Sequence, residues 1–142
     1  MYAKITNGSV DQFPYTIGQL RRDNPSVSFP AKIPDSILNQ YGVYPVTELD
    51  KPSYDSLTQT LTLGTPSLNG NQWEVSYIAE NRSQADAELL VRQNRDALLI
   101  ETDWMALSDV TMSSEMTTYR QALRDVPSQS GFPFNITWPT KP

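Results

Sequence analysis

The spacing of apolar side chains changes near Asn81, and this change constrains the fold more than any other feature. Before it, apolar and polar residues alternate over residues 57–63 and 73–79, as they do in β-strands. After it, residues 84–102 are mostly strong helix formers with apolar side chains three or four positions apart. The sequence therefore predicts an α+β protein with a β-rich domain at residues 1–80 and a helical domain at residues 81–142.

Asn7-Gly8 predicts a hairpin in the amino-terminal domain, because both central positions of a type I′ turn need a positive φ angle. The pairs that this turn sets opposite one another are Ile5 with Val10, Lys4 with Asp11 and Tyr2 with Phe13. Short helices are expected between residues 15 and 25 and at residues 35–42. The second of these has Asp35 or Ser36 as its candidate cap and Gly42 as a left-handed end.

A second hairpin is predicted at residues 57–80, with a three-residue loop at residues 69–71 that preserves the side-chain alternation. The facing pairs are then Leu63 with Tyr77 and Leu61 with Ala79. Trp73 and Tyr77 form either the core face of this hairpin or an aromatic platform for a sugar. Their regular alternation with polar residues favours the core.

Two helices are predicted in the carboxy-terminal domain. The first is capped by Ser83, and its apolar stripe consists of Ala87, Leu90, Val91, Asn94 and Leu98. The second begins at Ser113 or Ser114, ends before Pro127, and carries the stripe Met116, Tyr119, Ala122, Leu123 and Val126. Because each helix has one stripe to bury, we expect the two to pack as an antiparallel pair.

The chain ends in a segment rich in proline and aromatic residues, which we expect to be extended and laid over the helical pair. Its apolar residues, Phe132, Phe134, Ile136 and Trp138, alternate with polar or small ones. Prolines at positions 133, 139 and 142 exclude a central strand and leave an edge. Phe132, Phe134 and Trp138 are therefore candidates both for packing inward and for contact with a partner.

Composition excludes most enzymatic chemistry. The chain contains no Cys and no His, which removes thiol nucleophiles, Ser-His-Asp arrangements and the usual zinc and haem sites. We therefore expect no catalytic residue, no metal site and no cofactor, and a protein that is not an enzyme. A net charge of -5 without clustered Lys or Arg argues against nucleic acid as a partner, and the absence of a long apolar run argues against membrane insertion.

Four further polar and aromatic residues are candidates for partner binding. Trp104, between the helices and beside Asp103, either closes the end of the helical pair or is exposed as a binding hot spot. Closing the end is the interpretation we favour. Arg120 and Arg124 lie one turn apart beside the apolar stripe and form a candidate charged rim.

The carboxy-terminal residues resemble the bacteriophage tail assembly chaperone family, which includes tail fibre assembly proteins. The matching positions are Arg95, Asp96, Leu98, Leu99, Thr102-Asp103-Trp104, Asp109, the run Tyr119-Arg120-Gln121-Ala122-Leu123-Arg124-Asp125, Pro127, Gln129, Gly131-Phe132-Pro133, Ile136 and Trp138-Pro139. One departure is Met116, where the family pattern commonly has Trp one turn before the Tyr. The resemblance covers roughly the last sixty residues.

The resemblance implies a protein that acts in the host cytoplasm during phage assembly and helps a trimeric tail fibre to fold. In some related proteins the helper stays attached at the fibre tip in the virion. A β-rich trimer folds slowly and exposes unpaired edges meanwhile, so a small partner that covers apolar surface suppresses aggregation. The alternative from a different class is a receptor-binding or structural module of the fibre, with a host surface glycan as the partner.

Overall fold

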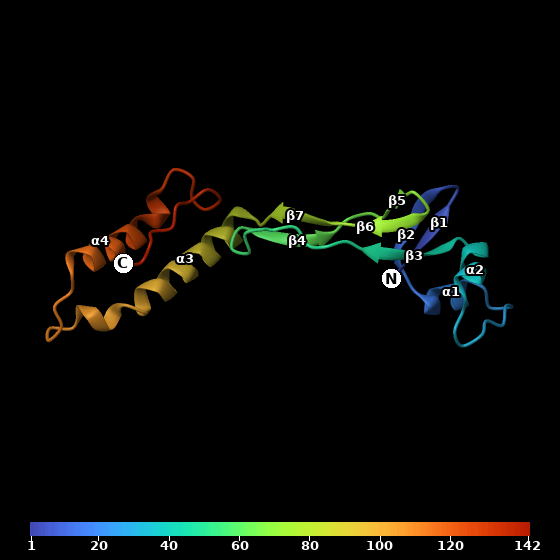
Figure 1. Ribbon diagram of the computed structural model, residues 1–142, viewed down its shortest axis with the longest axis horizontal. Coiled ribbons are helices and arrows are strands. Elements are labelled where there is room, and N and C mark those ends of the chain that lie inside the picture. The colour runs from blue at the N-terminus through green and yellow to red at the C-terminus, as the bar shows by residue number, and fades with distance from the viewer. The chain divides into compact units, whose positions relative to one another are not determined.

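The computed structural model describes residues 1–142 and confirms a mixed α+β protein (Figure 1). The strands are β1 (Tyr2–Thr6), β2 (Ser9–Tyr15), β3 (Val43–Glu48), β4 (Gln59–Leu63), β5 (Ser67–Asn69), β6 (Gln72–Val75) and β7 (Tyr77–Asn81). The helices are α1 (Ile17–Asp23), α2 (Asp35–Gln40), α3 (Gln84–Ile100) and α4 (Ser114–Asp125), with short 3₁₀ turns η1 (Asp103–Ala106) and η2 (Val126–Ser128).

The chain divides into two compact units. The first unit comprises Met1–Ser53 and Leu61–Ala79, and the second comprises Tyr54–Thr60 and Glu80–Pro142. The sequence placed a single boundary near residue 81. In the structure residues 54–60 instead belong with the helical part of the chain, although they precede the last strands of the first unit.

Residues 54–60 are held in the second unit by hydrogen bonds to Arg82. The Arg82 backbone nitrogen donates to the Thr58 oxygen (2.8 Å), and its side-chain Nε donates to the Ser56 oxygen (3.3 Å). The Asp55 carboxylate accepts from the Leu57 nitrogen and from the buried Thr58 hydroxyl, both at 2.9 Å. These local bonds fold residues 55–58 into a turn immediately before β4 begins.

A five-stranded sheet with the order β2-β1-β3-β6-β5 forms the first unit (Figure 1). The β3–β6 pair is parallel, and the other three pairs are antiparallel. Val43 packs against the residues of α1 and α2, while Val46 packs with Trp73. Because residues an odd number of positions apart face opposite sides of a strand, each face of the sheet has its own core.

The first hairpin forms at Asn7-Gly8, whose φ angles of 52° and 77° confirm the type I′ turn. Ile5 lies opposite Val10 as predicted, but the next two pairs differ: Lys4 faces Gln12 and Tyr2 faces Tyr15. The ladder is irregular between these pairs, so extra residues of β2 shift the register.

The short helices form where expected. Thr16 and Gln19 make a reciprocal capping box at the start of α1. At α2 neither Asp35 nor Ser36 acts as the cap, because the helix starts after Pro34 without a side-chain cap. Gly42 ends α2 with a φ of 69°, as predicted.

Tyr15 joins the end of β2 to the end of α1. Its hydroxyl donates to the Asp23 carboxylate at 2.5 Å. Burial, together with this hydrogen bond, raises the pKa of the Tyr15 hydroxyl from 10.0 to about 12.

The second predicted hairpin forms as two paired ribbons. Strands β4 and β7 pair with each other, while β5 and β6 form an inner hairpin. Hydrogen bonds from the Gly64 nitrogen to the Ser76 oxygen and from the Arg82 nitrogen to the Thr58 oxygen define one antiparallel register. In that register the predicted pairs Leu63 with Tyr77 and Leu61 with Ala79 lie opposite each other.

The loop of this second hairpin differs from the prediction. Leu68 pairs with Trp73 and Asn69 with Gln72, so the loop has two residues, Gly70 and Asn71. Gly70 takes a φ of 59°, which suits glycine there. Trp73 is buried, as expected for a core residue, whereas Tyr77 is only half-buried.

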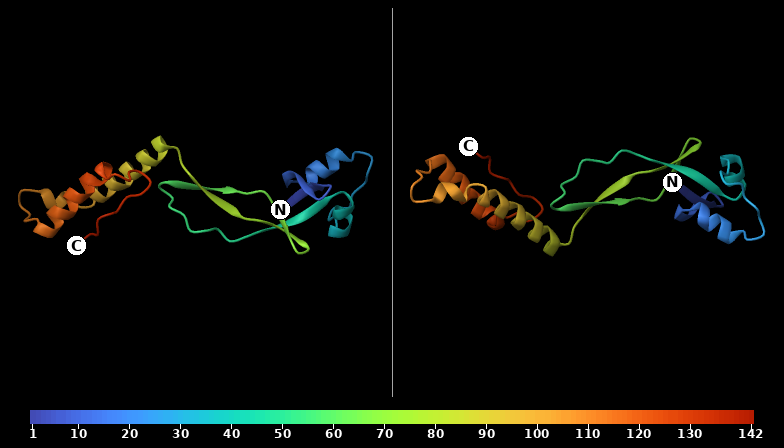
Figure 2. Two further views of the ribbon diagram at one scale, coloured as in Figure 1. Left: turned by 90° about the horizontal axis from the view of Figure 1, so that it is seen from above. Right: turned by 90° about the horizontal axis from the view of Figure 1, so that it is seen from below.

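In the second unit, α3 and α4 lie side by side and run in opposite directions (Figure 2). Ser83 caps α3 by accepting from the Asp86 nitrogen (3.2 Å), and Ser113 caps α4 by accepting from the Met116 nitrogen (3.2 Å). The buried core of this pair is Met116, Tyr119 and Leu123, with Leu98, Leu99, Met105, Met112 and Trp138 packed against it. None of the helices has the length and hydropathy needed to cross a bilayer.

The extended edge predicted for the carboxy-terminal segment is not confirmed, although Trp138 packs against the helical pair. Residues 129–135 form turns, and residues 136–142 form neither helix nor strand. The Gln129 side-chain amide explains this path, because it donates to the Thr137 oxygen (2.9 Å) and accepts from the Thr137 nitrogen (2.8 Å). This pair of bonds closes residues 129–137 into a loop.

Candidate partner-binding surface

Arg120 is a central structural residue of the second unit. It lies on α4 and is buried. Its Nη1 donates to the backbone oxygen of Leu99 (3.0 Å) and to Oγ1 of Thr102 (2.5 Å). Its Nη2 donates to the Asp103 carboxylate (2.8 Å). The planar guanidinium therefore ties α4 to the end of α3 and to η1 through three acceptors at once.

The prediction that Arg120 belongs to a charged rim is wrong. Arg120 follows Met116 by four residues and precedes Leu123 by three, so helical geometry places it within the buried stripe. Arg124 lies on the exposed side of α4 and forms no ion pair. Of the two arginines, only Arg124 is placed where a partner could reach it.

Thr102 is a fully buried polar residue whose role the sequence analysis missed. Its hydroxyl donates to the Leu99 oxygen (3.0 Å) and accepts from Arg120. The signal was present in the sequence as an Arg within the apolar stripe, because a buried guanidinium needs several acceptors nearby. No local pattern identifies Thr102 as one of them, since eighteen positions separate the two residues.

Trp104 does not close the end of the helical pair, so that expectation is wrong. Its side chain is 56% exposed, and Leu107 and Ile100 beside it in the chain are 57% and 68% exposed. Met105 takes the inward position instead and packs against the helical core. Asp103 forms an ion pair with the buried Arg120, but its own side chain is exposed. The candidate hot spot is thus accessible.

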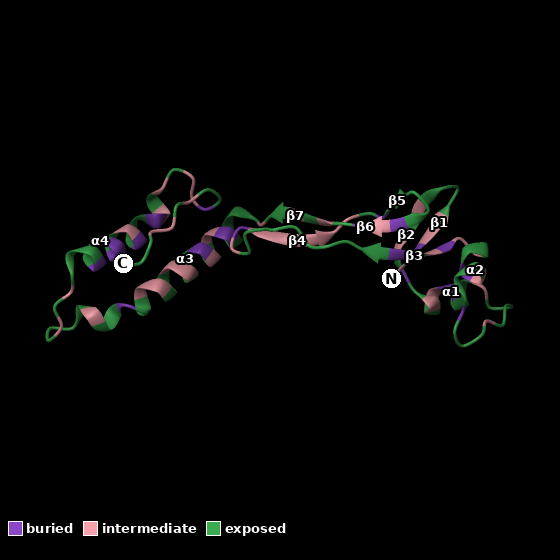
Figure 3. Ribbon diagram, viewed as in Figure 1, coloured by how far each residue is buried: buried purple, intermediate pink, exposed green.

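The three aromatic candidates near the carboxy terminus lie in different surroundings. Trp138 is half-buried against the Met116, Tyr119 and Leu123 cluster. The Phe132 ring lies under the Arg92 guanidinium, 5.0 Å from the ring centroid. Among the three, only Phe134 is exposed, at 41%. Figure 3 shows exposed and intermediate residues along most of that end of the chain.

Carboxylates dominate the charge around Trp104. Between Arg95 and Arg120 the chain carries five acidic residues and no Lys or Arg. Those five are Asp96, Glu101, Asp103, Asp109 and Glu115. A hydrogen bond from its own backbone nitrogen and bonds from two serine hydroxyls lower the pKa of Glu115, so this carboxyl stays ionised at neutral pH. Three of the five pair with Arg95, Lys141 and Arg120, so Asp109 and Glu115 are the unpaired negative charges in this stretch of the chain.

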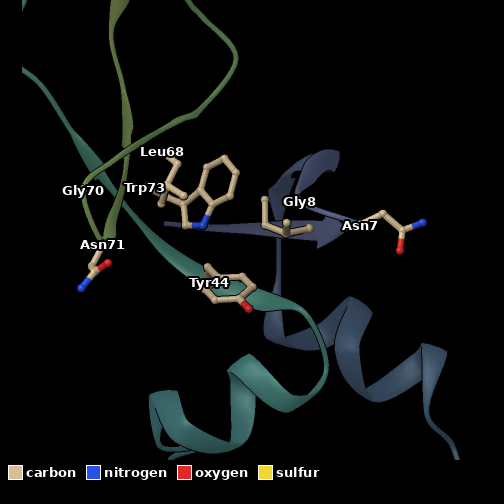
Figure 4. A pocket seen from close by; sticks show the side chains of 8 residues that line it. Asn7, Gly8, Tyr44, Leu68, Gly70, Asn71 and Trp73 are labelled. Carbon is tan, nitrogen blue, oxygen red and sulfur yellow. The ribbon is translucent and has the colours of Figure 1, made fainter.

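The first unit contains a separate hollow of about 440 Å³ on one face of its sheet (Figure 4). Its apolar lining consists of Ile5, Tyr44, Leu68 and Trp73, and the hairpin turns at residues 7–8 and 70–71 lie at its ends. The Tyr44 and Trp73 rings have centroids 6.4 Å apart and planes tilted by 50°. In Figure 4 the two asparagine side chains of the turns point away from these rings. The hollow thus offers apolar contact and few directed polar groups.

Acidic side chains do not gather anywhere in groups of three that could hold a metal ion. The arrangement in the second unit can instead offer an aromatic and aliphatic contact surface with ionised carboxylates around it. Such a composition is typical of the surfaces through which proteins contact one another.

The comparison with known proteins gives a match only in the second unit. Residues 88–142 match the family model described as phage tail assembly chaperone protein. The resemblance seen in the sequence is confirmed. The match lies wholly inside the second unit and includes α4, η1 and the Gln129–Thr137 loop. No curated protein and no solved structure gave a match to the chain.

The family match supports a chaperone role in phage tail assembly for the second unit. The residues of the Arg120 network and Trp104 all fall within the matched segment. The first unit, with its sheet and its aromatic hollow, lies outside the match.

Proposed function

We propose that this protein binds a phage tail fibre in the host cytoplasm and assists its folding and trimerisation without catalysing a covalent reaction. The observation that carries the proposal is the coincidence of the tail assembly chaperone match with a unit that leaves large apolar side chains exposed between its two helices, among them Ile100, Trp104 and Leu107. A folding β-rich trimer exposes apolar surface and strand edges for long periods. A partner that covers them transiently raises the yield of the trimer.

Co-expression tests this proposal directly. The fibre polypeptide expressed alone should yield mainly insoluble or monomeric material, and co-expression with the full chain should give a soluble trimer. Native gel electrophoresis and light scattering of the soluble fraction measure the outcome. A fibre that trimerises equally well without the chain, and forms no isolable complex with it, would contradict the proposal.

A variant pair within the chain separates specific rescue from a general effect of co-expression. Leu123→Asp introduces a carboxylate into the core of the second unit and should abolish rescue. Val27→Asp adds the same charge at an exposed position of the first unit and should leave rescue intact. Mass spectrometry of purified virions then distinguishes a helper released after assembly from one retained at the fibre tip.

A second candidate function is recognition of a host surface glycan. The observation in its favour is the exposed Trp104 ring next to the Asp103 carboxylate, since sugars bind through stacking on aromatic rings and hydrogen bonds to acceptors. Binding of the isolated full chain to immobilised host glycans, lost in Trp104→Ala, would place this function ahead of the chaperone.

A further inference from the structure

Residues 100–109 join the two helices of the second unit and are named here the hairpin tip. Several large apolar side chains of this segment point to solvent, while neighbouring side chains fill the core. Leu98, Leu99 and Met105 pack against the helical core. Ile100 and Trp104 remain 68% and 56% exposed, and Leu107 remains 57% exposed. The unit therefore has a complete core without these three side chains, and its own packing does not explain them.

The backbone of the hairpin tip is held in place by hydrogen bonds. The Met105 nitrogen donates to the Thr102 oxygen (3.1 Å), and the Val110 nitrogen donates to the Leu107 oxygen (3.1 Å). Arg120 fixes the start of the tip through Thr102 and Asp103. Because the backbone is already ordered, a partner that binds here loses less conformational entropy than it would on a mobile loop.

The charge of the hairpin tip limits what can occupy it. Within the tip, Glu101 pairs with Lys141 (3.3 Å) and Asp103 with Arg120 (2.8 Å). Asp109 in the tip, and Glu115 six residues further along the chain, form no salt bridge. Anionic lipid and nucleic acid are repelled by such a surface. A symmetric dimer of this chain would also set like charges opposite each other, because both copies contribute the same patch.

We propose that the hairpin tip is the docking surface for a segment of the tail fibre that carries an apolar side chain flanked by Lys or Arg. The proposal rests on the function proposed above and names the surface and the chemistry of the partner. Trp104 is the anchor, because buried aromatic rings at interfaces contribute most of the binding energy. The surrounding carboxylates orient the basic flanks and raise the association rate.

Binding of purified full-length variants to the co-expressed fibre, with Kd measured on the immobilised fibre, tests the anchor. Trp104→Ala should raise Kd by at least about thirtyfold, which corresponds to a hot spot of about 2 kcal/mol. Leu89→Ala is the matched control, because Leu89 lies on α3 in the same unit and is 55% exposed. That variant should change Kd by less than about twofold, as expected for an exposed side chain away from the contact.

A second pair of variants tests the contribution of the carboxylates to binding. Asp109→Lys is compared with Glu80→Lys, because both residues are exposed and neither forms an ion pair. Asp109→Lys should weaken binding and flatten its dependence on salt between about 50 and 500 mM, whereas Glu80→Lys should change neither. Thermal unfolding of every variant shows whether the fold is kept. If Trp104→Ala unfolds, the Kd values of Leu107→Ala and Asp109→Lys are used to test the docking surface instead.

The outcomes separate this inference from the proposed function. If the wild-type chain does not bind the fibre, the proposed function itself is contradicted. If the wild type binds and the folded variants at Trp104, Leu107 and Asp109 bind equally well, the docking surface lies elsewhere. A concentration-dependent dimer of the isolated chain that Trp104→Ala dissolves would assign the hairpin tip to a second copy and overturn the proposal. So would binding to host glycan that depends on Trp104.

Discussion

Arg120 shows how one side chain can determine the end of a helical pair. Its three hydrogen bonds connect residues that are about twenty positions apart in the chain. Replacing it would leave the Leu99 carbonyl and the buried Thr102 hydroxyl without their charged donor. Such losses cost more than an exposed ion pair, because buried polar groups cannot turn to water instead.

We therefore expect Arg120→Ala to lower the free energy of unfolding of the second unit by about 2–4 kcal/mol. Arg124→Ala is the control on the same helix, and it should change that free energy by less than about 0.5 kcal/mol because Arg124 is exposed and unpaired. Urea titration followed by the helical circular dichroism signal measures both. Equal effects of the two substitutions would contradict the structural role of Arg120.

Tyr15 makes the first unit sensitive to alkaline pH. Its pKa in the folded protein is raised from 10.0 to about 12, so folding favours the protonated hydroxyl. This contribution to stability is fully present below pH 10 and is lost as the pH rises toward 12. It amounts to roughly 2–3 kcal/mol, at about 1.4 kcal/mol for each unit of pKa.

Tyr15→Phe should remove this part of the alkaline loss of stability, whereas Tyr54→Phe, at an exposed position, should retain it. Urea midpoints of the full chain measured across the alkaline range provide the comparison. A wild-type chain and a Tyr15→Phe variant with parallel pH profiles would show that this hydroxyl does not have a raised pKa.

Helix α4 offers a test of capping at two adjacent serines. The sequence could not choose between Ser113 and Ser114, and the structure assigns the cap to Ser113 through its bond with the Met116 nitrogen. Ser113→Ala should cost about 1 kcal/mol of stability, whereas Ser114→Ala should cost less than about 0.5 kcal/mol. The same urea titration measures the stability lost in each variant. A larger loss for Ser114→Ala would show that Ser114, and not Ser113, is the cap.

The elements predicted best are those fixed by local chemistry. Asn7-Gly8 allowed the turn and the Ile5–Val10 pair to be predicted, because positive φ angles leave few alternatives. The pairs beyond it could not be predicted, since an irregular ladder depends on what the strand packs against. The extended tail is not confirmed for a similar reason: alternation along the chain gave no sign that the Gln129 amide bonds to Thr137 and closes a loop.

The candidate site could be predicted only in part. The sequence identified Trp104 as a candidate but favoured the interpretation in which it closes the end of the helical pair. Met105 fills that position in the structure, and nothing in the local pattern distinguishes the two neighbours. Thr102 was missed because its role depends on a long-range partner. Contacts across the chain, rather than spacing along it, determine these roles.

At the scale of the whole molecule, each unit has its own buried core. Leu38→Ala removes a fully buried side chain of the first unit, and Leu123→Ala removes one of the second. Each should cost about 2–5 kcal/mol. Native-state hydrogen exchange should show faster exchange mainly in the unit that carries the substitution.

The peptide that covers residues 54–60 makes this test specific. The structure places it in the second unit, so its amides should respond to Leu123→Ala and not to Leu38→Ala. Amides of residues 61–79 should respond in the opposite way. Exchange at residues 54–60 that follows Leu38→Ala would contradict the division of the chain.

Those seven residues also bear on how such a gene can be exchanged between phages. A recombination crossover at the codon for residue 80 transfers everything that matches the known family, yet it leaves behind the segment at residues 54–60 on which Arg82 depends. The recipient's own segment must then accept the hydrogen bonds of a foreign arginine. A crossover before residue 54 carries the whole second unit, but it also replaces the two strands that complete the recipient's sheet, β5 and β6. Neither exchange moves one unit without altering the other.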